Sequence, residues 1–247
     1  MNYVIFDLEF NQKHPSIKIS KEDKNSNLLF EIIQIGALKI NSNYKTLSTF
    51  NKLVNPSIHT VLHPYVESLT NIKSDDLNNS EIFPNVFNEF IDFIGSEEII
   101  FVVWGVSDIK ELIRNAEFFG FSQELIQKKY IDIQDYASKL FKYPKGTKIG
   151  LKNAIEHLNL PTTGEFHDAF NDAYYTALIF SSIHNKDMLP KIYSPSKKVQ
   201  TIVNKPTVNT TALLEQFRKM YNKDLTSEEE AMIKLAYIMG RTNQFTE

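Results

Sequence analysis

The order of strand-like and helix-like segments is the feature that most limits the fold of this chain. Three segments near the N-terminus, at residues 3–10, 31–40 and 44–54, are rich in β-branched and aromatic residues, which is typical of strands. Two more strand-like segments, at 99–103 and 130–133, alternate with segments of helical periodicity. This order predicts an α/β domain in which helices cover both faces of a mixed sheet.

The helical segments have apolar residues three and four positions apart, and they are predicted near residues 83–94, 108–118, 135–141, 150–158 and 168–183. Ser107 is a plausible N-cap for the second of them. Asp168 fits the start of the last helix better than it fits a ligand role. Ala169 and Ala173 are small, so this helix is expected to approach the sheet closely.

A change in composition near Asn185 predicts a boundary. We expect a main domain over residues 1–184 and an appendage over 185–247, formed by a basic connector and a helical hairpin. Thr226 and Glu229 have the spacing of a capping box before an apolar stripe. We expect the hairpin to dock on the main domain or on a protein partner.

Composition narrows the chemistry and the location. The chain has no cysteine, so a metal must be held by oxygen or imidazole ligands, and thiolate nucleophiles are excluded. Asp7 and Glu9 interrupt the N-terminal apolar segment where a signal peptide needs an unbroken one, and no segment is long enough to span a bilayer. A cytoplasmic location is therefore expected.

Acidic residues form the candidate site. Asp7 and Glu9 are two positions apart in a predicted strand and point to the same face, whereas Leu8 faces the opposite side and can pack in the core. Asp108 follows the strand at 99–103, at the edge where open α/β sheets bind ligands. Taken singly, these acids also fit a solvated strand end and the first turn of a helix.

His167 and Asp172 add a basic group to this set. Asp172 lies one turn inside the last predicted helix and His167 just before its start, so one short segment can bring both side chains to the same place.

Four segments together resemble the motifs of DEDDh 3′–5′ exonucleases in the ribonuclease-H-like superfamily. They are DLEF at 7–10, EIIQIGA at 31–37, WGVSD at 104–108 and HDAFNDA at 167–173. The resemblance covers residues 2–183 and is strongest to the branch that contains the enhanced-RNAi, histone-mRNA and sporulation-inhibitor exonucleases. It implies a five-stranded mixed sheet flanked by helices. Two positions depart from the family pattern: Gln34 stands where many relatives have Glu, and Asn11 where many have Thr.

The resemblance also implies the site and its reaction. It implies that two divalent ions, Mg²⁺ or Mn²⁺, are bound by Asp7, Glu9, Asp108 and Asp172. His167 would be the general base in hydrolysis of the 3′-terminal phosphodiester, with release of nucleoside 5′-monophosphates. Single-stranded RNA is favoured over DNA as the substrate. The implied substrate contacts are Leu8, Phe10 and Asn11, and Phe10 fits a place in the core equally well.

Basic residues are candidates for contacts with substrate phosphates. The net charge is −3, but residues 128–152 contain seven lysines and only two acids, Asp132 and Asp135. A second basic segment covers residues 186–205. Two other functions stay open: a non-catalytic module that binds nucleic acid or protein, and an endonuclease of the ribonuclease-H type.

Overall fold

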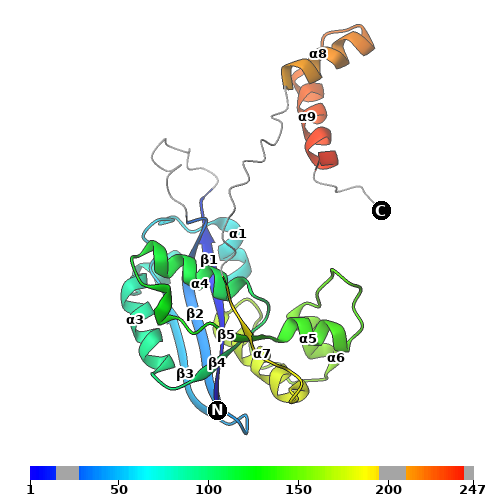
Figure 1. The fold of residues 1–247 in the computed structure, drawn as a ribbon. Coiled ribbons are helices and arrows are strands. Elements are labelled where there is room, and N and C mark those ends of the chain that lie inside the picture. The colour runs from blue at the N-terminus through cyan, green and yellow to red at the C-terminus, as the bar shows by residue number, and fades with distance from the viewer. Residues whose placement is uncertain (15–27, 195–209, 242–247) are drawn as a thin grey trace. The chain divides into compact units, whose positions relative to one another are not determined.

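The computed structural model describes residues 1–14, 28–194 and 210–241. The described strands form one mixed sheet in the order β3-β2-β1-β4-β5-β6 (Figure 1). β1 pairs antiparallel with β2 and parallel with β4. The strands are β1 (Asn2–Gln12), β2 (Phe30–Asn41), β3 (Thr46–Leu53), β4 (Ile99–Val103), β5 (Lys129–Asp132) and β6 (Lys191–Ile192). The predicted α/β class and mixed sheet are confirmed.

Helices cover both faces of the sheet, and each face has its own apolar core (Figure 1). One core joins the sheet to α3 (Phe83–Ile94) and α4 (Ser107–Phe118). The other joins it to α5 (Ile133–Leu140), α6 (Leu151–His157) and α7 (Ala169–Ile183). The remaining helices of this part are α1 (Pro64–Thr70), α2 (Ser74–Asn78) and the 3₁₀ helix η2 (Gln123–Leu125).

Alternation along β1 decides which residues belong to which face. Val4, Phe6 and Leu8 are buried in the core beneath α3 and α4. Tyr3 and Ile5 are buried in the core beneath α7. Because successive side chains of a strand point to opposite faces, Asp7 and Glu9 continue the α7 side of the sheet.

Two local expectations were wrong, and two short helices were not predicted. The sheet has a sixth strand, because the two residues of β6 pair antiparallel with β5. Ser107 is the first residue of α4 rather than its N-cap, which is Val106 with no capping side chain. The short helices α1 and α2 were not predicted, because neither is long enough to repeat an apolar period.

The chain divides into two compact units, residues 1–195 and 196–247. The second contains α8 (Thr210–Tyr221) and α9 (Ser227–Arg241). Its predicted capping box is confirmed: Thr226 N donates to Glu229 Oε2 at 2.9 Å, and Glu229 N donates to Thr226 Oγ1 at 3.3 Å. The basic segment over 195–205 lies outside the described residues. Within the described ranges, no helix is both long and apolar enough to cross a membrane.

Candidate active site

The site begins on the α7 side of β1. Asp7 pairs across the sheet with Gly36 of β2, and Glu9 pairs with Gln34. Glu9 is only 9% exposed. Pairing with β2 thus holds the two carboxylates in place, beyond Ile5, the last residue of β1 that pairs with β4.

Asp108 and Asp172 join these carboxylates from two helices. Asp108 lies in the first turn of α4, directly after the carboxyl end of β4, and Asp172 lies in the first turn of α7. Both are buried. Electrostatic interaction links Asp7 to all three other acids, Glu9, Asp108 and Asp172. The four acids that the sequence singled out are therefore neighbours in space.

The proximity of these acids changes their protonation. Burial, together with the charges of the other acids, raises the pKa of Asp7 well above its ordinary value. Burial first, and then Asp172 and Asp108, raise the pKa of Glu9 to about 8. The pKa of Asp108 is also raised to about 8 and that of Asp172 to about 6, in both cases chiefly by burial. A charged site of this kind therefore needs a cation.

His167 lies at the exposed side of the cluster. One ligand atom from each of Glu9, His167 and Asp172 falls within 4.8 Å of the others. The backbone of His167 is left-handed, with a φ of 65°, which is uncommon for a residue with a side chain. Its backbone N–H donates to Asp172 Oδ2 at 3.2 Å, so the two residues are joined directly.

The segment before α7 is fixed to the helix by several hydrogen bonds. Asn171 Nδ2 donates to Glu165 O at 3.0 Å, and Gly164 N donates to the hydroxyl of Tyr175 at 2.8 Å. Asp168 accepts from Asn171 N at 2.9 Å and is the N-cap of α7, which confirms it as a helix-start residue. These contacts place His167 beside the acids.

Gly36 and Gln34 of β2 hold the other side of α7, and sequence reasoning assigned neither of them a place in the site. The α7 backbone at Ala169 lies directly over Gly36. A glycine inside a strand was the available signal, because it often marks the close approach of another backbone. The predicted close approach of α7 through Ala169 is confirmed.

The residues present fit a divalent cation. The Oδ1 atom of Asp172 is buried and accepts no hydrogen bond from the residues that the structure describes. A buried polar atom without a partner is rare in proteins and often marks the site of an ion. Four carboxylates and one imidazole supply the hard oxygen and nitrogen ligands that Mg²⁺ and Mn²⁺ prefer.

The three predicted substrate contacts have different surroundings. Leu8 is 3% exposed and belongs to the core, so its side chain is not available to a substrate. Asn11 is completely buried: its Nδ2 donates to His59 O and Val61 O, and its Oδ1 accepts from His63 N. Its side chain holds the loop before α1, so a substrate contact by Asn11 needs correction. Phe10 is partly buried and lies edge-to-face against Phe30.

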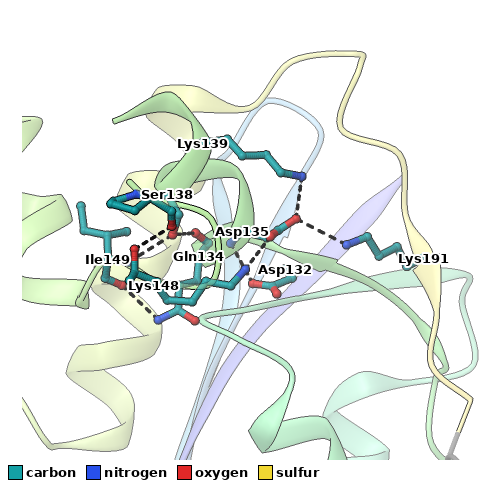
Figure 2. A network of polar contacts seen from close by, with 10 residues as sticks. Asp132, Gln134, Asp135, Ser138, Lys139, Lys148, Ile149 and Lys191 are labelled. Atoms are coloured by element: carbon teal, nitrogen blue, oxygen red, sulfur yellow. Dashed lines mark hydrogen bonds and ion pairs between the residues drawn. The ribbon is translucent and has the colours of Figure 1, made fainter. Parts of the chain in front are cut away.

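The predicted lysine patch is partly neutralised. Figure 2 shows Asp135 between Lys139, Lys148 and Lys191, which all form ion pairs with it. The hydrogen bonds from Lys139 and then Lys148 lower the pKa of Asp135 well below its usual range. Lys129 pairs with Glu98. The lysines of this patch that are exposed without an ion pair to a described residue are Lys142, Lys145 and Lys152.

A family model described as Exonuclease (RNase_T) matches residues 4–180, a region that includes all five clustered residues. The chain belongs to the exonuclease family. The chain is 23% identical over 168 residues to 3′-5′ exoribonuclease 1 of Rattus norvegicus and 24% identical to that of Homo sapiens. The match covers 64% of the chain and 48% of each relative, so the chain spans about half the length of these relatives.

Solved structures confirm the ribonuclease-H-like fold of this chain. The nuclease domain of 3′hExo, a DEDDh family member bound to rAMP, superposes with a TM-score of 0.64 at 21% identity, covering 78% of this chain and 96% of that one. Exonuclease X in complex with 5′ overhanging duplex DNA superposes with a TM-score of 0.52 at 16% identity, covering 76% and 96%. The resemblance to DEDDh exonucleases is therefore confirmed at the level of family and fold.

Proposed function

We propose that this protein is a metal-dependent 3′–5′ exonuclease that hydrolyses the terminal phosphodiester bond of single-stranded RNA and releases nucleoside 5′-monophosphates. The observation that carries the proposal is the convergence of Asp7, Glu9, Asp108 and Asp172 beside the exposed His167. Residues 1–184 would carry this activity, and residues 185–247 would be an appendage. Membership of the exonuclease family supports the reaction class.

Each residue of the cluster has a role in this proposal. Asp7, Glu9, Asp108 and Asp172 would hold two divalent ions, which when bound neutralise charge on the attacking and leaving oxygens. His167 would accept the proton of the attacking water, because its imidazole lies at the exposed side of the acids. Burial of the acids excludes bulk water from the ligand side, which strengthens their interaction with a cation.

Phe10 would contact the terminal nucleotide. It follows Glu9 on β1 and lies next to Phe30, which is 40% exposed. An aromatic ring stacks on any base, so this contact would not select a sequence. RNA is preferred in the proposal because the relatives are named exoribonucleases, and a 21% identical structure describes 3′-end recognition of a histone mRNA stem-loop.

The test uses single-stranded RNA and DNA of one sequence, each labelled at the 5′ end. The wild type is incubated with Mg²⁺, with Mn²⁺ or with a chelator, beside Asp7→Asn and the control Asp92→Asn on the exposed side of α3. We expect a ladder that shortens from the 3′ end with either metal, faster on RNA, and absent with chelator and with Asp7→Asn.

A circular RNA distinguishes the remaining alternatives. It has no 3′ end, so its cleavage would overturn the exonuclease proposal in favour of an endonuclease. Failure to cleave either linear strand, in a protein that metal stabilises, would favour a non-catalytic binding module.

A further inference from the structure

Gln34 lies beside the acidic cluster without belonging to it. It is on β2, directly across from Glu9 in the sheet, and it is only 3% exposed. Its neutral amide therefore enters an acidic site without adding to the negative charge there.

Both ends of the Gln34 amide are used to hold the start of α7. Its Oε1 accepts from Ala169 N at 3.1 Å, and its Nε2 donates to Asp168 Oδ2 at 2.8 Å. Ala169 N is one of the first amides of the helix, which have no partner inside the helix. Gln34 thus supplies that partner from a neighbouring strand.

The residues held in this way adjoin the proposed catalytic groups. Asp168 follows His167 in the chain, and its backbone carbonyl accepts from Asp172 N at 2.9 Å. Its other carboxylate oxygen caps α7. Any shift of this first turn against β2 would move Asp172 and His167 relative to Asp7 and Glu9, which lie on the adjacent strand β1.

The amide of Gln34 satisfies the contacts on both sides at once. Its N–H₂ donates to a carboxylate and, at 3.1 Å, to Asn51 Oδ1, while its oxygen accepts from a backbone N–H. A carboxylate at this position would accept from Ala169 N but would face Asp168 with no proton to share. An apolar side chain would leave Ala169 N and Asp168 Oδ2 without this partner.

We infer that Gln34 is a positioning residue that fixes the first turn of α7 to the sheet and thereby sets the distance between the ligands on α7 and those on β1. The inference rests on the proposed function, because it assigns these acids to a metal. It predicts that the loss of Gln34 weakens metal binding more than it weakens the fold.

The test measures the Mn²⁺ concentration at which half of the metal-induced rise in melting temperature is reached. For Gln34→Met, which keeps the length and removes the hydrogen bonds, we expect this midpoint to rise about tenfold, as for other residues that orient metal ligands. With RNA as substrate, kcat should fall while KM changes little. Ser138→Ala, which removes the hydrogen bonds of the Ser138 hydroxyl with Gln134 O and Ile149 N, is the control for a purely structural effect.

An exchange of the amide of Gln34 with the carboxylate of Asp168 tests the hydrogen bond between them. The double variant Gln34→Glu, Asp168→Asn swaps amide and carboxylate, keeps the total charge, and leaves an asparagine that still caps α7. We expect its Mn²⁺ midpoint to return toward that of the wild type, and this variant decides the question if Gln34→Met does not fold.

The inference is overturned if Gln34→Met keeps the wild-type midpoint, or if the exchange variant stays as impaired as Gln34→Met. A wild type that shows no Mn²⁺-induced stabilisation would instead contradict the proposed metal site. The two failures are therefore distinguishable.

Discussion

A Cβ atom placed on Gly36 would lie 2.2 Å from the carbonyl carbon of Ala169. This separation is far below any van der Waals contact, so β2 and the first turn of α7 approach as closely as two backbones can. Gly36 pairs with Asp7 in the sheet. The contact therefore sets how near the proposed ligands on α7 come to the proposed ligand Asp7 on β1.

Gly36→Ala should separate α7 from the sheet. We expect a loss of about 1–3 kcal/mol in the free energy of unfolding, which is typical of overpacking, together with a weaker stabilisation by Mn²⁺. Gly150→Ala is the matched control, because a Cβ there meets nothing within 4 Å. Thermal and urea denaturation with and without Mn²⁺ measure both effects. If both variants lose the same free energy of unfolding and are stabilised equally by Mn²⁺, the contact between Gly36 and α7 does not position the proposed ligands.

His167→Ala should remove the proposed general base while leaving the acids in place. We expect kcat to fall by about 100-fold or more, the usual range for loss of a general base, with the Mn²⁺-induced rise in melting temperature largely retained. His157→Gln, an exposed histidine of α6, is the control. The rate is followed by the shortening of a 5′-labelled RNA from its 3′ end. An unchanged kcat would exclude His167 as the base.

The metal-free protein should become less stable as the pH rises. The pKa values of Glu9 and Asp108 are raised from 4.5 and 3.8 to about 8, so between about pH 5 and pH 8 the folded state keeps protons that the unfolded state has lost. The free energy of unfolding therefore falls with pH across this range. Bound Mg²⁺ should weaken or reverse the trend, because it stabilises the ionised acids.

Melting temperatures at pH 6 and at pH 8.5, with chelator and with Mg²⁺, measure this dependence. Asp108→Asn should flatten the metal-free curve, because its side chain no longer titrates. A metal-free protein that is equally stable at both pH values would show that the acids do not hold protons in the folded state.

The fold could be predicted where short-range patterns decide it. The strand at Ile99–Val103 was predicted to the residue, because an apolar segment of that length ends at a Trp-Gly turn. Asp168 was predicted as the start of α7 for an equally local reason, the capping of free N–H groups. The two residues of β6 carry no such pattern, because their pairing depends on where the chain returns after α7.

The acids of the site could be predicted because strand alternation and strand ends determine their positions. The environment of Asn11 could not, because its burial depends on a loop some fifty residues further along the chain. The sequence also could not predict which lysines of the patch are neutralised. A count of charges does not reveal that one acid, Asp135, forms ion pairs with several lysines.

The lysines should divide into two groups in their effect on substrate binding. Lys142, Lys145 and Lys152 are exposed, and no ion pair to a described residue occupies them, so their charges are available to phosphates. Replacing all three by Gln should raise KM for a long single-stranded RNA and reduce the slope of log binding constant against log salt by about 2, since each phosphate contact on a single strand contributes about 0.7.

The double variant Lys139→Gln, Lys148→Gln is compared with this triple variant, because the charges of Lys139 and Lys148 are already paired with Asp135. The double variant should change the salt dependence less and lower the melting temperature more, since Lys148 joins the loop after α5 to that helix. Fluorescence anisotropy of a labelled RNA, measured in Ca²⁺ or with Asp7→Asn to prevent cleavage, gives the slopes. If the double variant loses more RNA binding than the triple variant, the substrate phosphates lie near Lys139 and Lys148 instead.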